Sequence, residues 1–242
     1  MIYAYRSDRG LRKKNEDSFY VPDEGKRPVV IVADGMGGHI AGEVASRTAI
    51  ERIVSFVEKA PEGSSSTVLL RQAINEANKA VFEMALNNSD LSGMGTTAVV
   101  TLLYPTKFTV AHIGDSRVYH FNGSSLRRVT KDHSFVQELV SSGVITEEQA
   151  MVHPQRNIIT RAIGTSRFEK ADAAVKSWEK DDILMLCSDG LCGSVYDKEM
   201  EEILKSSDDL LRCCDLLAER AYDNGSSDNI TVVLVKNTEA DV

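Results

Sequence analysis

Hydrophobic positions along the chain recur with two periods, which predict where strands and helices form. Short apolar runs, many of them rich in β-branched residues, predict strands over 2–9, 19–21, 29–33, 95–104, 107–113, 117–121, 125–130, 171–178, 183–187 and 230–235. Apolar residues spaced three and four apart predict helices over about 41–60, from the break at 61–63 to about 88, and over 135–140, 197–205 and 208–222. The predicted order is strands, a helix pair, strands, a second helix pair and a last strand.

Short turns join most of the predicted strands, which favours antiparallel pairing over repeated strand–helix–strand units. Pro105-Thr106 joins two strands, and Asn122-Gly123 predicts a type I′ hairpin. We therefore expect an α+β fold, a four-layer α/β/β/α sandwich of two stacked antiparallel β-sheets flanked by helix pairs. Residues 142–165 are expected to form a mobile surface flap, with a capping box at residues 146–149.

Composition narrows the class of protein. The chain has 242 residues, which fits a single domain over residues 1–242. Its net charge of −8, with no dense run of Lys and Arg, argues against nucleic-acid binding. No apolar run is long enough to span a membrane, and the first ten residues lack the apolar core of a signal peptide, so we expect a cytoplasmic protein. The four cysteines are expected to be reduced and buried.

Acidic residues recur where the predicted strands begin or end. The apolar run 29–33 leads directly into Asp34-Gly35, and other strand boundaries carry Glu16-Asp17, Asp115, Asp189 and Asp228. Any one of these residues fits an ordinary strand-end turn. Antiparallel strands can bring such ends to one rim, however, where clustered carboxylates need a positive partner. Oxygen-only ligands indicate Mg²⁺ or Mn²⁺, and a two-metal site is a recurrent solution to phosphoryl hydrolysis.

Arg12 lies four residues before Glu16. A guanidinium group is a good match for phosphate oxygens, so Arg12 is a candidate phosphate ligand. An ordinary surface arginine is an equally good interpretation of Arg12 alone.

Seven stretches together resemble the metal-dependent Ser/Thr protein phosphatases of type 2C, in their compact bacterial form. They follow the family order and cover nearly the whole chain. They are Arg12-Lys13-Lys14-Asn15-Glu16-Asp17, Val32-Ala33-Asp34-Gly35-Met36-Gly37-Gly38-His39, Gly95-Thr96-Thr97, Gly114-Asp115-Ser116-Arg117, His153-Pro154-Gln155-Arg156-Asn157, Cys187-Ser188-Asp189-Gly190-Leu191 and Ser227-Asp228-Asn229-Ile230-Thr231.

The resemblance implies a role for each site residue. Asp34 would bridge two Mn²⁺ or Mg²⁺ ions, and Gly35 would bind one of them through its carbonyl oxygen. Asp189 and Asp228 would hold the other ion, and Asp115 with Asp189 would hold a third, weaker metal. The remaining roles are those of Glu16, which would act through a metal-bound water, Asp17, in the outer shell, and Arg12, which would hold the substrate phosphate. Residues 142–165 match the flap of the bacterial members.

The implied reaction is hydrolysis of phosphoserine and phosphothreonine on proteins by a metal-bridging hydroxide, with Arg12, Asp34, Asp189 and Asp228 as the catalytic set. The resemblance also implies phosphoprotein substrates, among them a bacterial Ser/Thr protein kinase and its targets, and we expect a monomer. One position departs from the eukaryotic pattern. Met36 stands where those members have a His proposed as general acid, which leaves His39 or a metal-bound water as the proton donor.

Three other functions remain open on the sequence. A phosphatase dedicated to one regulator in a partner-switching pathway would share the metal site. A catalytically weak phospho-binding adaptor of the same fold would be expected to lack metal ligands, and none of the main positions is missing. A metal-dependent nuclease is disfavoured by the low positive charge.

Overall fold

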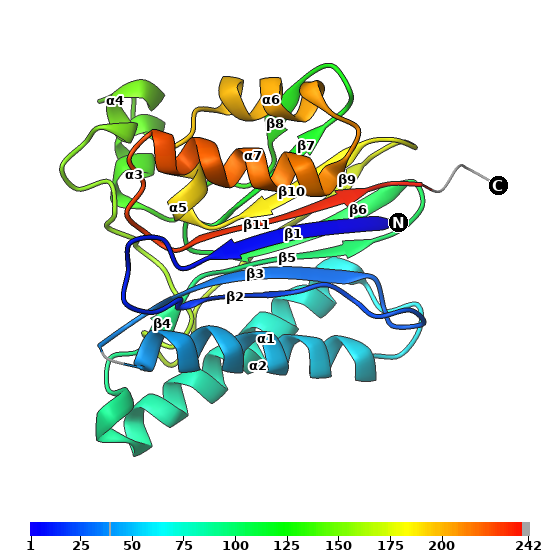
Figure 1. Ribbon diagram of the computed structural model, residues 1–242. Helices are drawn as coiled ribbons and strands as arrows, with labels where there is room; N and C mark the ends of the chain where they lie inside the picture. The colour runs from blue at the N-terminus through cyan, green and yellow to red at the C-terminus, as the bar shows by residue number, and fades with distance from the viewer. Residues whose placement is uncertain (39, 239–242) are drawn as a thin grey trace.

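Two sheets stack face to face, and a layer of helices covers the outer face of each (Figure 1). The computed structural model describes residues 1–38 and 40–238. Within these residues every pairing between strands is antiparallel. The predicted α+β fold, a four-layer sandwich flanked by helix pairs, is confirmed.

The chain passes back and forth between the two sheets, and it often adds several consecutive strands to one sheet before it crosses to the other. The first sheet has the order β1-β11-β10-β7-β8, and its strands are Ile2–Asp8, Ile230–Lys236, Ile183–Cys187, Arg117–Phe121 and Leu126–Arg128. The second sheet has the order β2-β3-β5-β6-β9, and β4 also pairs with β3. Its strands are Asp17–Tyr20, Val29–Met36, Ala98–Leu103, Lys107–Ile113, Asp172–Ser177 and, for β4, Gly95–Thr96.

Each helix pair covers one sheet. Helices α1 (Ala41–Lys59) and α2 (Ser66–Asn87) pack on the second sheet, and the short 3₁₀ helix Ser89–Leu91 follows them. Helices α6 (Asp197–Ser206) and α7 (Leu210–Asp223) pack on the first sheet. None of the described helices combines the length and apolar character that a membrane crossing requires.

Strand β3 shows why its sequence is a continuous apolar run. Val29, Ile31 and Ala33 pack toward the helices, whereas Val30 and Val32 pack between the sheets. Both faces are therefore buried, so both need apolar residues. The strand continues to Met36, beyond its predicted end at Ala33. By the same alternation, Asp34 follows Val30 and Val32 on the face between the sheets.

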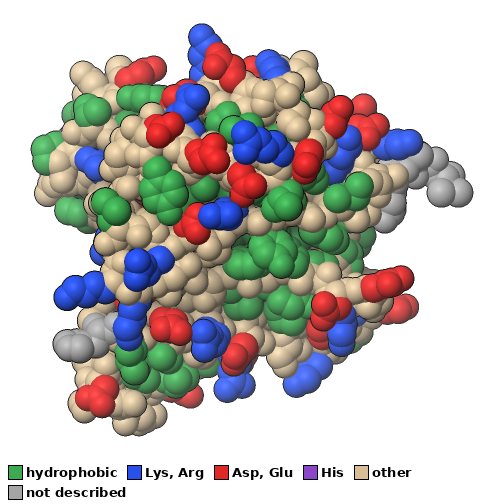
Figure 2. Space-filling view, viewed as in Figure 1, with side chains coloured by type: hydrophobic (Ala, Val, Ile, Leu, Met, Phe, Trp, Pro, Cys, Tyr) green, Lys and Arg blue, Asp and Glu red, His purple; other side chains and the backbone are tan. Residues whose placement is uncertain are grey.

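The two edge strands β1 and β2 meet along one side of the sandwich. The rings of Tyr5 and Phe19 have centroids 4.5 Å apart, which closes the seam between the sheets. Figure 2, which has the same viewpoint as Figure 1, shows hydrophobic side chains gathered along this seam and charged side chains of both signs around them.

Three local predictions were wrong or incomplete. The strand predicted over 95–104 is divided at Thr97 into β4 and β5. The turn at Asn122-Gly123 is not type I′, because only Gly123 has a positive φ. The hairpin loop instead has four residues, and the Asn122 side chain accepts hydrogen bonds from the backbone N–H groups of Ser124 and Ser125. The short helix α5 (Asp189–Cys192) was not predicted.

Residues 142–165 were predicted to form a flap, but the last part of this segment is bound to the sandwich. Helix α3 (Phe135–Ser141) precedes it, and helix α4 (Glu147–Met151) lies within it and begins with the predicted capping box. Its last part is fastened to the sandwich. The Phe135 N–H donates to the Ile158 carbonyl at 2.8 Å, and Ile163, which is fully buried, forms an antiparallel bridge with Thr96.

Candidate metal centre

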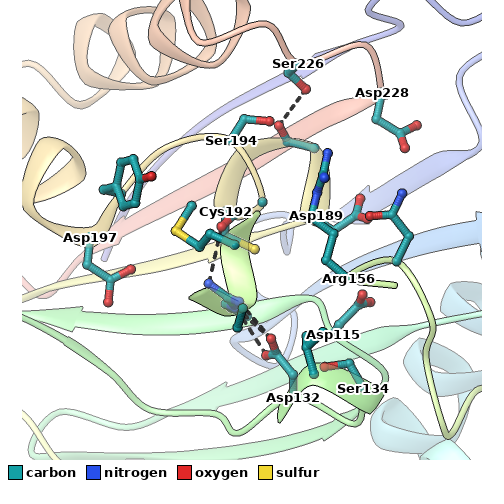
Figure 3. A pocket seen from close by; sticks show the side chains of 18 of the residues that line it. Asp115, Asp132, Ser134, Arg156, Asp189, Cys192, Ser194, Asp197, Ser226 and Asp228 are labelled. Carbon is teal, nitrogen blue, oxygen red and sulfur yellow. Dashed lines mark hydrogen bonds and ion pairs between the residues drawn. The ribbon is translucent and has the colours of Figure 1, made fainter. Parts of the chain in front are cut away.

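Carboxylates from both sheets converge at one end of the sandwich. Asp17 on β2 and Asp34 on β3 are opposite one another in the strand register. Asp189 begins α5 directly after β10, and Asp228 lies two residues before β11. Asp115 lies between β6 and β7. Asp115, Asp189 and Asp228 also line a pocket, which Figure 3 shows. The volume of this pocket is about 550 Å³.

The cluster carries more negative charge than its surroundings compensate. Burial, reinforced by the nearby Asp189 and Asp228, raises the pKa of Asp17 to about 7. Burial also raises the pKa of Asp34, followed by the effects of Asp17 and Asp189. The pKa values of Asp115 and Asp189 are raised for the same two reasons, burial first and neighbouring carboxylates second. Like charges held this close favour a bound cation.

Two carboxylate oxygens give a direct test of this interpretation. Among the described residues, Asp17 Oδ1 and Asp189 Oδ1 are buried and have no hydrogen-bond partner. Buried polar oxygens are normally satisfied, so such atoms need an unobserved partner. Because every side-chain donor atom here is a carboxylate oxygen, the cluster fits hard divalent cations such as Mg²⁺ and Mn²⁺.

Ser188 joins the two sheets below the cluster. Its hydroxyl donates to Asp17 Oδ2 at 2.7 Å and accepts from the Thr231 N–H at 3.0 Å. The bond leaves Oδ1 of Asp17 as the unpartnered oxygen. Asp17 belongs to the second sheet, and its Oδ2 oxygen is therefore held by Ser188, which directly follows β10 of the first sheet.

The loop that carries Arg12 and Glu16 is held by Asn229, which stands in one of the family-like stretches but was given no role from the sequence. The Asn229 amide donates to the carbonyl oxygens of Arg9 and Lys14 at 2.7 and 2.8 Å, and it accepts from the Glu16 N–H at 2.8 Å. All these bonds come from one buried side chain, next to Asp228 in sequence. Only its place beside Asp228 could have signalled this role.

Arg12 reaches the same centre. Its Nη2 lies 2.7 Å from Asp228 Oδ2, and slightly more than half of its side chain is exposed. The guanidinium is therefore close to the carboxylates yet accessible from the pocket, whose walls include both residues. Burial raises the pKa of Glu16, which lies on the same loop.

Gly35 permits a close approach and does not form a turn. A Cβ atom at this position would lie 2.1 Å from the Gly42 carbonyl oxygen and 2.6 Å from that of Glu16. The Gly35 N–H donates to the Glu16 carbonyl at 3.1 Å, so the strand is pressed against the loop that carries Glu16. The strand-end turn considered for Asp34-Gly35 is not observed, because β3 continues through both residues.

Two threonines hold the backbone of Asp34. Thr97 Oγ1 accepts from the Asp34 N–H at 3.0 Å, and Thr96 Oγ1 donates to the Asp34 carbonyl at 2.8 Å. Thr97 Oγ1 also bonds to the Ser116 hydroxyl at 2.7 Å, next to Asp115. The break between β4 and β5 thus links the neighbourhoods of two acidic residues.

Asp132 is another buried carboxylate in the wall of this pocket, but unlike the cluster it is paired with arginines. Asp132 accepts from Arg117 at 2.8 to 3.2 Å, through Nε and Nη2, and forms an ion pair with Arg128 at 2.5 Å. Arg117 also donates to the Cys192 carbonyl at the end of α5. This network was not predicted from the sequence.

The structure thus brings together the predicted residues Arg12, Glu16, Asp34, Gly35, Asp115, Asp189 and Asp228. His39, the possible general acid, lies outside the described residues. The four cysteines are buried and free, as predicted.

Comparison with known proteins gives a consistent result. The model of the family described as Protein phosphatase 2C matches residues 6–230. The serine/threonine phosphatase stp of Listeria monocytogenes is 42% identical over 242 residues, which cover 98% of this chain and 96% of that protein.

Solved structures agree with this match. The serine/threonine phosphatase Stp1 of Staphylococcus aureus superimposes with a TM-score of 0.91 at 37% identity, covering 97% of this chain and 94% of that one. The catalytic domain of the phosphatase PstP, solved in complex with two manganese ions, has a TM-score of 0.86 at 37% identity and covers 97% of each chain.

Proposed function

This chain belongs to the protein phosphatase 2C family and is a metal-dependent protein serine/threonine phosphatase, and we propose that the carboxylate cluster is its catalytic centre. One observation carries the proposal. Asp17 and Asp189 present buried, unpartnered oxygens within a group of carboxylates that raise one another's pKa. Such a group requires cations, which are also the cofactors that phosphoryl hydrolysis uses.

We assign the cation ligands residue by residue. Asp34 would hold both of two Mn²⁺ or Mg²⁺ ions, and the carbonyl oxygen of Gly35 would help to hold one of them. Asp189 and Asp228 would hold the other ion, and Asp115 together with Asp189 would hold a third, weaker one. Glu16 would act through a water molecule. The support is that Asp34, Asp115 and Asp189 come from different segments, yet burial and neighbouring carboxylates raise the pKa of each.

Arg12 is the proposed phosphate ligand. When bound, the ions supply Lewis acidity that acidifies a water molecule and neutralises phosphoryl charge. The Arg12 guanidinium binds phosphate oxygens and disperses the negative charge that develops in the transition state. The ion pair with Asp228 orients the guanidinium toward the centre before substrate arrives. The remaining donors of the planar fork are then available to phosphate.

The proton donor for the leaving group stays a separate prediction. Met36 ends β3 and carries no ionisable group, which leaves His39 or a water molecule at the centre. A His39→Ala variant that loses turnover on a phosphoserine peptide, while its Mn²⁺ affinity is unchanged, would support His39. Unchanged turnover would exclude His39 from this role.

We further propose that residues 1–242 form one catalytic domain, that the protein is monomeric and cytoplasmic, and that it dephosphorylates a Ser/Thr kinase and its targets. Support comes from the family match over residues 6–230 and from the Listeria relative, of which this chain covers 96%. Phosphoproteins are the substrates of a Ser/Thr protein phosphatase, and the kinase that made them is a natural member of that set.

The direct test is hydrolysis of p-nitrophenyl phosphate and of a phosphothreonine peptide. We expect activity with Mn²⁺, loss of activity with a chelator, and recovery on readdition of Mn²⁺. A phospho-binding adaptor would bind the peptide with similar affinity but would not release phosphate with either cation. Inactive, correctly folded protein in the presence of Mn²⁺ and Mg²⁺ would refute the catalytic proposal.

A further inference from the structure

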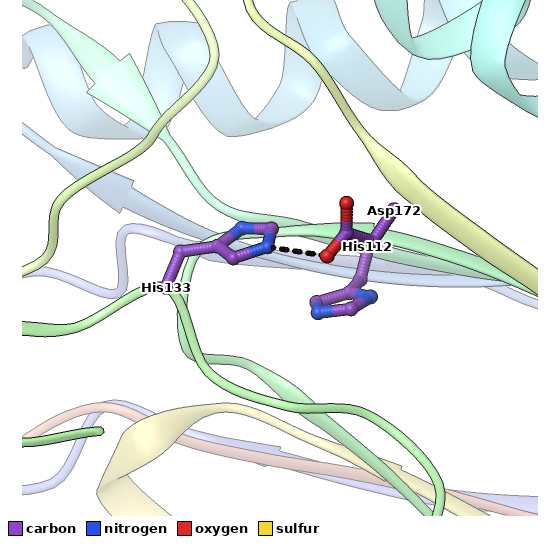
Figure 4. A group of neighbouring side chains, drawn as sticks. All are labelled: His112, His133 and Asp172. Carbon is purple, nitrogen blue, oxygen red and sulfur yellow. Dashed lines mark hydrogen bonds and ion pairs between the residues drawn. The ribbon is translucent and has the colours of Figure 1, made fainter. Parts of the chain in front are cut away.

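Two histidines and an aspartate form a second cluster of possible metal ligands, made of residues that the proposed catalytic centre does not include (Figure 4). His112 lies on β6, His133 lies just before α3, and Asp172 begins β9. The two imidazole rings stack with centroids 4.7 Å apart and an angle of 13° between their planes. His133 is 6% exposed, and its Nε2 lies 3.3 Å from Asp172 Oδ2. The nitrogen and oxygen ligand atoms lie within 4.8 Å of one another, a spacing that would suit a metal ion.

The hydrogen bonds of His133 argue against a metal ion in this cluster. The Gly114 N–H donates to His133 Nδ1 at 3.2 Å. A backbone N–H can only donate, so Nδ1 carries the lone pair and the ring proton of neutral His133 is on Nε2. That Nε2–H points at Asp172, which leaves no nitrogen free to bind a metal. The Arg161 guanidinium, 3.6 Å from Asp172, adds a positive charge that would repel one.

His133 instead holds the turn that carries Asp115. Its backbone N–H donates to the Gly114 carbonyl at 2.9 Å, while its ring accepts from the Gly114 N–H. Both backbone polar groups of Gly114, the residue directly before Asp115, are thus bound to His133. Gly114 has φ +97°, and a Cβ there would lie 2.5 Å from the Thr97 side chain, so the turn is tightly confined on the opposite side as well.

The same residue holds the end of the flap. The His133 carbonyl accepts from the Thr160 N–H at 2.8 Å. The ring edge faces Asp172 and lies 3.3 Å from Arg161 Nη1. Burial, followed by the neighbouring His112, lowers the pKa of His133, which keeps the ring in the neutral form that these bonds require. His133 therefore joins the Asp115 turn, the flap end and β9.

We propose that His133 is a positioning residue for the third-cation subsite, and that its Nδ1 lone pair fixes the Gly114–Asp115 turn so that the Asp115 carboxylate faces Asp189. The inference rests on the proposed role of Asp115. It predicts a selective effect, because the backbone of Asp34 is held by Thr96 and Thr97 and the loop beside Asp228 is held by Asn229. Loss of the Nδ1 acceptor should therefore weaken the third cation and spare the other two.

Two substitutions separate the two ring nitrogens. In His133→Asn the side-chain oxygen replaces Nδ1 as the acceptor from Gly114, whereas the partner of Asp172 is lost. In His133→Gln the amide nitrogen replaces Nε2 as the donor to Asp172, whereas the acceptor from Gly114 is lost. Both variants lose the stacking on His112, so they control for each other's effect on packing.

The experiment titrates the full-length protein with Mn²⁺ by calorimetry and measures amide exchange of Gly114 by NMR. We expect wild type to bind three ions. His133→Gln should weaken the third by about tenfold, a typical effect of losing a residue that orients a metal ligand. Its two tighter sites should change by less than about twofold, and its Gly114 amide should exchange faster. His133→Asn should retain both the third site and Gly114 protection.

The outcomes distinguish this inference from the proposed function. If wild type binds three ions and both variants weaken the third equally, or neither does, the role of Nδ1 is refuted while the subsite stands. If wild type binds only two ions, the Asp115 subsite is wrong, and this inference falls with it. In that case Mn²⁺-dependent hydrolysis by the same sample would still support the phosphatase.

Discussion

A buried aspartate, Asp132, and the acidic cluster of the metal centre lie beside one pocket, and they differ in what compensates their negative charge. Asp132 is held by the guanidinium groups of Arg117 and Arg128, whose side chains are both mostly buried. The charged groups that act on Asp34 are other carboxylates, and Asp189 has Asp228 and Asp34 beside it as well as the more weakly acting Arg12 and Arg117. The Arg12 guanidinium, on which both carboxylates act, pairs with Asp228, and slightly more than half of its side chain is exposed.

The difference separates a structural ion network from a ligand-binding site. Removing a carboxylate from water has a large free-energy cost. At Asp132 the ion pairs with Arg117 and Arg128 offset this cost. At Asp17 and Asp189 the chain leaves buried oxygens without partners. The missing compensation must come from outside the chain, so we expect the cluster that contains Asp17 and Asp189, rather than Asp132, to bind cations.

The largest expected effect comes from removing a proposed cation ligand. Asp189→Ala should lower kcat/KM for p-nitrophenyl phosphate at saturating Mn²⁺ by at least about 100-fold, because cations stabilise the transition state by several kcal/mol. Calorimetric titration with Mn²⁺ should show the loss of bound ions in the same sample. Wild-type activity in a variant that binds fewer ions would break the distinction between the two acidic groups.

The next effect concerns stability, and its sign should differ between the two groups. Asp132→Asn should lower the free energy of unfolding by about 3 kcal/mol, because it removes the carboxylate that pairs with Arg117 and leaves the mostly buried Arg128 only the more distant Glu147 as a charged partner. The isosteric change Asp189→Asn should instead raise the stability of the cation-free protein, because it removes one of several repelling charges. Urea denaturation with a chelator measures both. Equal destabilisation by the two substitutions would contradict the comparison.

Arg12 tests whether the exposed guanidinium serves substrate. Arg12→Ala should lower kcat/KM for a phosphothreonine peptide by about 30-fold, the value of a charge-assisted hydrogen bond of about 2 kcal/mol. Arg12→Lys should recover part of this loss, since it keeps the charge but not the planar fork. A melting temperature close to that of wild type is the control. An unchanged kcat/KM would return Arg12 to the class of ordinary surface arginines.

The smallest effect is the pH dependence of the cation-free protein. Folding raises the pKa of Asp17 to about 7, and it also raises the pKa values of Asp34 and Asp189. A carboxyl with a raised folded-state pKa contributes stability that is fully present below its unfolded pKa, near 4, and is lost as pH rises through the folded value.

The melting temperature in chelator should therefore fall by about 4 °C or more between pH 5 and pH 8. Mn²⁺ should reduce or reverse this fall, because cations compete with protons for the same oxygens. Differential scanning calorimetry with and without Mn²⁺ provides the measurement. A melting temperature that rises with pH in chelator would show that the cluster is compensated by the chain after all.

Much of the fold followed from local pattern. The continuous apolar run before Asp34 predicted a strand buried on both faces, and the alternating sides of Val29 and Val30 confirm it. The helix pairs were found because each must bury one apolar stripe. Predictions failed where a side chain competes with the backbone pattern. Thr97 interrupts a strand to bond Asp34, and Asn122 replaces a two-residue turn with a four-residue loop.

The sequence by itself determined the sandwich, the positions of the acidic residues at strand boundaries, and the motifs that mark the family. These depend on short-range periodicity and on the order of residue types. Only the tertiary structure decided that Asn229 fastens the Arg12 loop, that Asp132 is paired while Asp189 is not, and that His133 holds the turn beside Asp115. Each of these roles depends on a hydrogen bond or an ion pair between residues that are far apart in the chain. The role of His133 also depends on which of its ring nitrogens carries the proton. Neither kind of information is present in the local sequence.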